Sequence, residues 1–271
     1  MAMTCDLPFV DIHCHLLPGI DDGAESWDTT LAMARQAVED GIETVVVTPH
    51  QLGSYSSNRG DMIRSLVGET RKFLAQHQIP LRIEPGADVR IEPEMIAGLR
   101  SGEIVSLADL RKHVLLELPH ELYFSIDRVL DQLNRDGMTG ILSHPERNKG
   151  ILERPEVVEP LVRRGCLMQI TAASLIGTFG SDCQRISEWL LKQGLVYFIS
   201  TDAHSTRSRR PNLSRAFAVA AEIAGVEFAL DLCCRNPACV ADGKEVQPLI
   251  RPIHRSSKGL FSSLFKKRTT G

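Results

Sequence analysis

The regular alternation of short apolar runs with helix-like stretches constrains the fold of this chain more than any other feature. The runs are rich in β-branched residues and are bounded by Gly, Pro or Asn, which is typical of buried parallel strands. Seven such runs lie at residues 8–12, 43–48, 81–85, 113–118, 139–143, 166–170 and 195–200. Seven β–α units in one domain predict either a closed or nearly closed α/β barrel or a doubly wound open sheet.

Helix boundary signals lie between these runs. Ser26 is expected to cap a helix that ends at Gly41, and Asp61 is expected to cap the next helix. Later helices are expected to end at Gly137, Gly165 and Gly194. The pattern predicts a single domain over residues 6–245, followed by a basic, flexible tail over residues 246–271.

Composition excludes several classes of protein. Of the 271 residues, 43% are hydrophobic and 24% are charged, which is ordinary for a globular protein. No run approaches the roughly 18 apolar residues of a membrane span, and the N-terminus has no secretory pattern. The seven cysteines form no CxxC pair, which favours reduced thiols in a cytoplasmic protein. The net charge is −3, and residues 251–271 carry Lys and Arg but no acid, so the acidic body argues against nucleic-acid binding.

Side chains that commonly ligate metals follow six of the seven runs. The carboxyl ends of parallel strands share one rim, so these side chains should converge in space. They are His13, His15, Asp22, His50, Asp88, Glu117, His144, Asp202 and His204. His13 and His15 are two residues apart on a strand and should point to the same side. Imidazole and carboxylate ligands suit zinc, manganese or iron, and this many ligands would hold two or three ions.

Other candidates have a plainer interpretation. His77, His113, His120 and His254 lack the strand-end context and are expected to be ordinary structural residues. Asp21 is interpreted as a turn residue, and Cys14 as a packing residue. The chain has no GxSxG elbow, no Walker loop and no Cys-x5-Arg phosphatase loop, so those mechanisms are excluded.

The segments DIHCHLLPGIDDGA, VVTPH, LELP, SHPERN and STDAHS resemble, in this order, the polymerase-and-histidinol-phosphatase superfamily. They are most similar to its bacterial protein-tyrosine phosphatases of capsule and exopolysaccharide operons. The resemblance extends from Asp11 to about Arg210. It implies an α/β fold of one domain, a distorted (β/α)7 TIM-like barrel, with up to three metal ions that are often Mn2+.

The resemblance also implies roles for individual residues. One ion would be held by His13, His15, Asp88 and Asp202, a second by Asp22, His50 and His204, and a third by Asp88, Glu117 and His144. Arg147 and Arg209 match arginines that bind phosphate, with Arg207 and Arg210 as nearby alternatives to Arg209. The bridging position is usually glutamate in this branch and is Asp88 here.

The implied activity is metal-dependent hydrolysis of phosphotyrosine, by attack of hydroxide that the metals generate from water. The implied substrate is a membrane-associated bacterial tyrosine kinase that controls polysaccharide synthesis. Phenolate is a good leaving group because its pKa is about 10, which independently favours aryl phosphates. Three alternatives stay open: a small-molecule phosphatase of the histidinol-phosphatase type, a metal-dependent amidohydrolase, and a non-catalytic metal-containing protein that docks a kinase.

Two segments outside the predicted ligand set could contact the substrate or its surroundings. Residues 51–60 follow His50 and form a polar loop, in which Tyr55 is expected to be a solvated side chain, with the lining of a substrate groove as the alternative. In the tail, one helical face would carry Leu260, Phe261, Leu264 and Phe265 beside cations. That face either contacts an anionic membrane or the kinase, or belongs to a disordered tail. The expected location is the cytoplasm, with the inner face of the membrane as the peripheral alternative.

Overall fold

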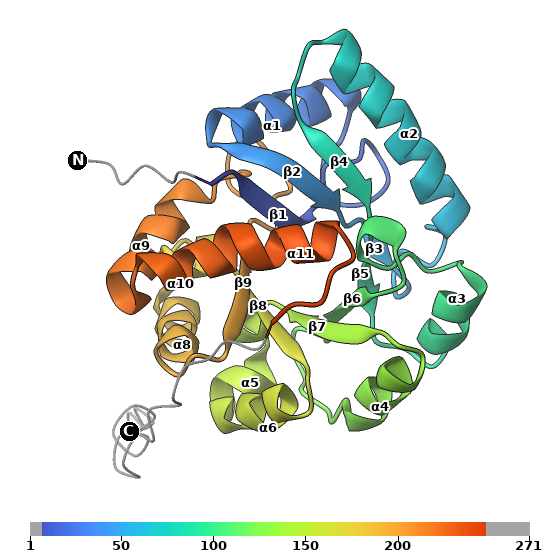
Figure 1. The fold of residues 1–271 in the computed structure, drawn as a ribbon. Helices are drawn as coiled ribbons and strands as arrows, with labels where there is room; N and C mark the ends of the chain where they lie inside the picture. The colour runs from blue at the N-terminus through green and yellow to red at the C-terminus, as the bar shows by residue number, and fades with distance from the viewer. Residues whose placement is uncertain (1–6, 248–271) are drawn as a thin grey trace, which may run out of the picture.

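The computed structural model describes residues 7–247 and contains nine strands, all of which pair in parallel (Figure 1). The strands are β1 (Phe9–Cys14), β2 (Ile42–Val47), β3 (His50–Gln51), β4 (Arg82–Pro85), β5 (Asp88–Arg90), β6 (His113–Glu117), β7 (Thr139–Ser143), β8 (Leu167–Thr171) and β9 (Val196–Ser200). Each of the seven predicted apolar runs coincides with one of them.

The nine strands form seven staves of a barrel, because β2 with β3 and β4 with β5 are two halves of interrupted strands. One sheet has the order β1-β2-β4 and the other has the order β3-β5-β6-β7-β8-β9. The ring continues from β9 to β1 beyond the strand ends: Asp202 N donates to His13 O at 2.7 Å, and His15 N donates to Ala203 O at 2.9 Å. The predicted barrel is therefore confirmed, and the open doubly wound sheet is wrong.

Helices connect the strands and cover the outside of the barrel (Figure 1). They are α1 (Trp27–Glu39), α2 (Gly60–Gln76), α3 (Met95–Ser101), α4 (Asp127–Arg135), α5 (Lys149–Glu153), α6 (Val158–Arg163), α7 (Ala172–Leu175), α8 (Ser181–Lys192), α9 (Ser214–Ala224), α10 (Val226–Leu230) and α11 (Asn236–Ala241). Short turns of other helix types are η1 (Leu107–Asp109), η2 (Pro145–Arg147), η3 (Pro155–Val157) and η4 (Asp231–Arg235).

The helix boundaries test the predicted caps. Ser26 caps α1 as predicted, since its side chain accepts a hydrogen bond from Thr29 N. The prediction that Asp61 caps α2 is wrong, because the helix already begins at Gly60. Gly60 N donates to Glu103 O at 2.8 Å, and a Cβ at Gly60 would lie 2.6 Å from Gly102 O. That tight approach sets the helix start. The expected stops at Gly137, Gly165 and Gly194 all have positive φ, at +72°, +87° and +68°.

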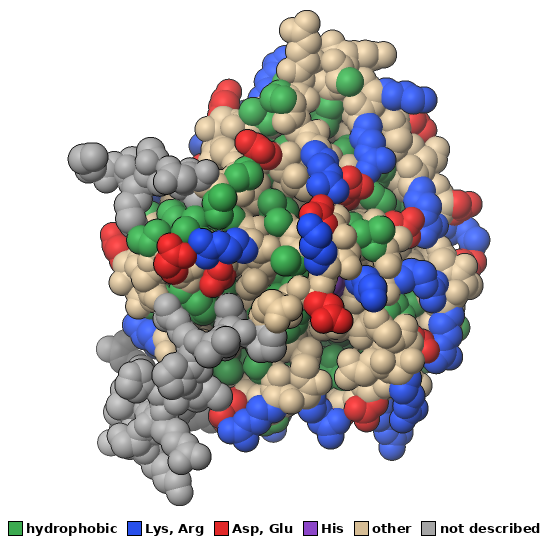
Figure 2. Space-filling view, viewed as in Figure 1, with side chains coloured by type: hydrophobic (Ala, Val, Ile, Leu, Met, Phe, Trp, Pro, Cys, Tyr) green, Lys and Arg blue, Asp and Glu red, His purple; other side chains and the backbone are tan. Residues whose placement is uncertain are grey.

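Two apolar layers separate the inside of the barrel from its outside. The larger cluster joins the strands to the outer helices, whereas the smaller one contains inward residues of the strands together with Leu107, Val240 and Ala241. Val240 and Ala241 belong to α11, which lies across the amino ends of the strands (Figure 1). The barrel is thus closed at that end by an apolar helix, and any open site must lie at the opposite end. Basic and acidic side chains are interspersed over the face that carries α11 (Figure 2).

No helix among residues 7–247 is long and apolar enough to cross a membrane. The predicted domain boundary at residue 245 stays a prediction. The predicted amphipathic face of the tail, at Leu260, Phe261, Leu264 and Phe265, lies outside the described residues.

Candidate metal centre

The nine residues predicted as metal ligands meet at the carboxyl ends of the strands. Their ligand atoms form four groups, and within each group the atoms lie within 4.8 Å of one another. The groups are His15, Asp22, His50 and His204; His13, His15 and Asp88; His13, His144 and Asp202; and His50, Asp88 and Glu117. Segments separated by almost 200 residues in sequence therefore build one cluster of imidazoles and carboxylates.

His13 and His15 face each other at the end of β1. Their Nε2 atoms are 3.3 Å apart, and Asp202 Oδ1 lies 3.2 Å from the first and 3.4 Å from the second. Each ring has its other nitrogen occupied: His13 Nδ1 lies 2.9 Å from Gln169 Oε1, and His15 Nδ1 lies 2.7 Å from Asp21 Oδ2. Such partners fix the tautomer and leave the Nε2 lone pairs directed into the cluster, as metal ligands require.

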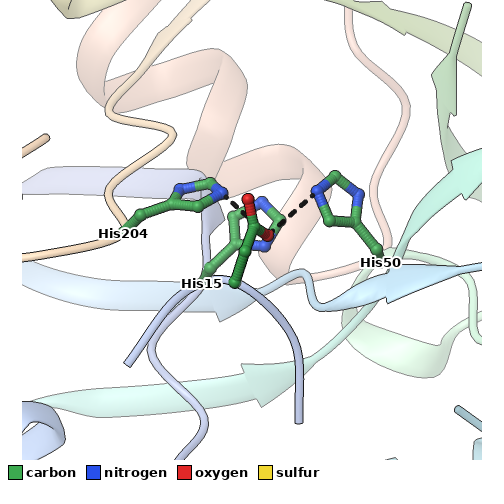
Figure 3. A group of neighbouring side chains, drawn as sticks. His15, His50 and His204 are labelled. Carbon is green, nitrogen blue, oxygen red and sulfur yellow. Dashed lines mark ion pairs between the residues drawn. The ribbon is translucent and has the colours of Figure 1, made fainter. Parts of the chain in front are cut away.

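His50 and His204 approach from the two sides of His15 (Figure 3). Their Nε2 atoms lie 3.5 Å and 3.4 Å from the same oxygen of Asp22. His204 Nδ1 is within 2.9 Å of Asp202 O, whereas its buried Nε2 has no hydrogen-bond partner in the described part of the chain. The free nitrogen again faces the cluster.

Asp88 lies at the start of β5 and is fully buried, and neither of its carboxylate oxygens has a hydrogen-bond partner within residues 7–247. Its Oδ2 is 3.6 Å from His13 Nε2, 3.6 Å from His50 Nδ1 and 3.8 Å from His144 Nε2. These separations are too long for hydrogen bonds. They suit ligand atoms that share a cation at about 2.0–2.2 Å from each. An unpartnered buried carboxylate is costly, so the donor set fits divalent metal ions.

The pKa values of the cluster are shifted in both directions, because buried imidazoles and carboxylates lie close together. Burial lowers the pKa of His144 to about 3 and that of His50 to about 4, so both imidazoles are neutral, as ligands must be. Burial, together with the neighbouring Asp88, raises the pKa of Glu117 to about 8. Although burial opposes it, Asp21 and Asp202 raise the pKa of His15 to about 10. The carboxylates therefore produce a field that favours cations at this rim.

Asp21 was predicted to be only a turn residue, and the structure corrects this. Its Oδ2 binds His15 Nδ1 and also accepts a hydrogen bond from His50 N at 3.1 Å, so it orients two of the predicted ligands. The turn can approach because Gly23 has no side chain: a Cβ there would lie 2.3 Å from His15 O. Gln169 was likewise not predicted as the partner of His13. A ligating histidine usually donates its second ring N–H to a carboxylate. The closeness of Asp21 to His13 and His15 in sequence was therefore a signal that could have identified its role.

Arg147 and Arg209 lie beside the cluster and share one acceptor. Arg147 Nη1 donates to Asp202 Oδ2 at 2.5 Å, and Arg209 Nη2 donates to the same oxygen. Asp202 thus directs Oδ1 toward the imidazoles and Oδ2 toward the guanidinium groups. Arg207 and Arg210 are exposed, so of the three nearby arginines it is Arg209 that reaches the site.

The backbone at two predicted ligands is unusual. His144 and Asp202 adopt left-handed conformations, with φ of +33° and +51°. Non-glycine residues in this region are uncommon and cluster at functional sites. Asp202 and His204 lie beyond β9, which ends at Ser200. Their side chains nevertheless meet, with His204 Nδ1 3.6 Å from Asp202 Oδ1.

The rim contains further residues whose predicted roles need correction. Tyr55 is not simply solvated: it is partly buried, and its ring stacks on His50 at a centroid distance of 5.3 Å. His120 stacks on His144 at 5.5 Å. Both line a groove of about 280 Å³ beside His50 and Glu117, together with Arg90. Cys14 is buried in the apolar core, as predicted.

The fold and the site together define the class of this protein: a parallel (β/α) barrel that carries imidazoles, carboxylates and two arginines at its open rim. Residues 9–242 match the family described as "Capsular polysaccharide synthesis, CpsB/CapC", and the chain belongs to this family. It is 35% identical over 223 residues to the tyrosine-protein phosphatase YwqE of Bacillus subtilis, covering 81% of this chain and 86% of that protein. It is 25% identical over 233 residues to the tyrosine-protein phosphatase CpsB of Streptococcus pneumoniae, covering 84% of this chain and 96% of that one.

A solved structure shows the same fold. It comes from work described as "Crystal structures of YwqE from Bacillus subtilis and CpsB from Streptococcus pneumoniae, unique metal-dependent tyrosine phosphatases". It aligns with a TM-score of 0.84 and 32% identity, over 89% of this chain and 100% of that chain.

Proposed function

We propose that this chain is a metal-dependent protein-tyrosine phosphatase of capsular or exopolysaccharide synthesis. The observation that carries the proposal is the shared Asp202, which holds two guanidinium groups against the cluster of nine ligand-type side chains to which it belongs. The phosphatase names of the YwqE and CpsB relatives support the same activity. The nine metal ligands and the two arginines are the proposed site residues, and Mn2+ is the proposed ion, two or three per chain.

When bound, divalent ions would supply Lewis-acid chemistry, since they activate water and neutralise phosphate charge. The chain's own residues supply position. Arg147 and Arg209 would bind the phosphate oxygens on the side away from the imidazoles, because planar guanidinium groups match phosphate geometry. His13, His15 and His204 would hold the ions through Nε2, because the Nδ1 atom of each ring already has a fixed partner.

Leaving-group chemistry favours phosphotyrosine over phosphoserine. A tyrosine phenolate has a conjugate pKa of about 10, so it departs with little help from an acid. A serine alkoxide is far more basic and would need a well-placed general acid. We therefore propose phosphotyrosine residues of a membrane-associated bacterial tyrosine kinase as the substrate. A cytoplasmic location, with peripheral contact at the inner membrane face, suits that partner.

The test is phosphate release from a phosphotyrosine peptide, a phosphoserine peptide and histidinol phosphate, each after chelation and after Mn2+ is restored. We expect chelation to abolish release from the phosphotyrosine peptide and Mn2+ to restore it, with little release from the phosphoserine peptide. Faster turnover of histidinol phosphate would instead favour a small-molecule phosphatase. Binding of Mn2+ without turnover of any ester would favour a protein that only docks a kinase.

A further inference from the structure

Phe179 lies at the same rim, in the loop between α7 and α8. Arg147 Cζ is 4.7 Å from the centroid of its ring, and Arg209 Cζ is 6.0 Å from it. Both distances fall within the range of cation–π contacts. The ring is partly exposed and belongs to neither apolar core cluster. Its described ring contacts are therefore with the two arginines rather than with the core.

The loop that carries Phe179 is held in a defined conformation. Thr178 N donates to Ala173 O at 2.9 Å, and Gly180 N donates to Gly177 O at 3.1 Å, so Phe179 occupies a closed turn. This loop and the Arg147 segment are anchored to the same strand end. The buried Glu146 accepts a hydrogen bond from Thr171 N at 2.9 Å, and Thr171 is the last residue of β8 before α7. The relative position of Phe179 and Arg147 is thus fixed by the fold.

From this geometry we propose that Phe179 is a specificity-determining residue that forms one wall of a subsite for the aryl ring of the substrate. The inference rests on the proposed function and deepens it. In an aryl phosphate, one oxygen atom separates the ring from phosphorus. A phosphate bound by Arg147 and Arg209 can therefore direct its ester group toward the ring that contacts both of them. A partly exposed aromatic ring there offers offset or edge-to-face packing to a phenyl ring, which a serine methylene cannot match.

The contact exists in the bound substrate as well as in the transition state. Its removal should therefore raise KM for a phosphotyrosine peptide and leave kcat nearly unchanged. In Phe179→Leu, which keeps an apolar side chain over the arginines, we expect kcat/KM for that peptide to fall roughly threefold to tenfold. For the alkyl ester β-glycerophosphate we expect a change of less than about twofold. Phe179→Tyr should retain the wild-type preference, because it keeps the ring.

A binding measurement makes the test independent of turnover. Phenylphosphonate and methylphosphonate are titrated into the Mn2+-loaded full-length protein by calorimetry. Wild type should bind phenylphosphonate about tenfold more tightly than methylphosphonate, and Phe179→Leu should reduce that ratio to about two. Phe73→Leu is the matched control, since Phe73 is a partly buried aromatic on α2 that contacts Trp27 of α1 and His77 just beyond α2. It should keep the wild-type ratio.

An unchanged aryl preference in Phe179→Leu would overturn the proposal. Equal losses for aryl and alkyl ligands would also overturn it, because they would show that Phe179 acts only by positioning the two arginines. A wild-type protein that turns over no ester would defeat the proposed phosphatase function. The phosphonate ratio would still decide, separately, whether Phe179 forms an aryl subsite.

Discussion

The two ends of the barrel are built from the same strands but from opposite kinds of residues. At the amino ends, α11 contributes Val240 and Ala241 to an apolar cluster that fills the interior. At the carboxyl ends, nine imidazole and carboxylate side chains converge with two arginines. One end stabilises the fold, whereas the other concentrates like-charged and desolvated groups that cost stability unless a ligand compensates them.

Strand β6 extends from the apolar end of the barrel to the ligand cluster within five residues. His113, Leu115 and Glu117 alternate along the strand and share one face. His113 lines a groove near the amino end, Leu115 lies in the inner apolar cluster, and Glu117 belongs to the ligand cluster. The position along the strand, rather than residue type alone, therefore decides whether a titratable group is structural or functional. Changes at the rim should reduce activity with little loss of stability, and changes at the closed end should do the reverse.

The largest effect is expected from His13→Ala. This change removes a predicted ligand whose Nε2 faces both Asp88 and Asp202. Loss of outer partners of metal ligands typically costs tenfold to a hundredfold, so loss of the ligand itself should lower kcat/KM by at least about a hundredfold. The increase in Tm that Mn2+ produces should also be much smaller than in wild type. His77→Ala, at an exposed position beyond α2, is the control; wild-type activity in His13→Ala would contradict the proposed centre.

A smaller effect is expected from Asp21→Asn. The amide keeps the shape of the side chain but removes the charge that holds His15 Nδ1–H and thereby directs Nε2 into the cluster. We expect Mn2+ affinity to fall roughly tenfold to a hundredfold, measured by calorimetry. Saturating Mn2+ should recover most of the activity. An unchanged affinity would return Asp21 to the role of a turn residue.

The third prediction compares substitutions of two neighbouring arginines, Arg209 and Arg207. Arg209→Lys keeps the charge but loses the planar donor set that reaches Asp202, and we expect a loss of about tenfold in kcat/KM on a phosphotyrosine peptide. Arg207→Lys, at an exposed position, should leave the rate unchanged. Equal effects of the two changes would mean that general positive charge, rather than the position of Arg209, assists the reaction.

The seven parallel staves could be predicted from the sequence because each contains a short apolar run that a linear pattern reveals. The short strands β3 and β5 could not be predicted, since they lie beyond the runs at 43–48 and 81–85 and are separated from them by Pro49 and Gly86. The closing helix α11 was also missed. Its role depends on packing across the barrel, and no periodicity in a six-residue helix reports that.

The candidate ligands could be predicted for a related reason: parallel strands bring their carboxyl ends together whatever the loops do. The orienting residues could not, because Asp21 reaches His15 only through a turn that closes against the His15 backbone. Phe179 was missed for the same reason, since its position over Arg147 depends on the loop after α7. Loop conformation depends on tertiary packing, so the pattern of residues at strand ends does not predict functional residues that lie in loops.

A change at His113 tests the closed end of the barrel, where we expect an effect on stability rather than on activity. It is 4% exposed, its Nδ1 has no hydrogen-bond partner among the described residues, and burial with the adjacent Lys112 lowers its pKa to about 4. The unfolded chain, with a histidine pKa near 6.5, binds this proton more readily than the folded chain does. Stability should therefore fall as pH drops from about 6.5 toward 4, by roughly 2 kcal/mol between pH 7 and pH 5.

His113→Gln removes this titration, so its free energy of unfolding should fall by roughly 2 kcal/mol less than that of wild type over the same interval, measured by urea unfolding at each pH. His77→Gln, at an exposed histidine, should retain the wild-type slope. In His113→Gln, kcat/KM should match wild type, because residue 113 lies at the opposite end of β6 from the cluster. A large loss of activity in this variant would show that the two ends of the barrel are coupled, and that stability and function are not divided between them.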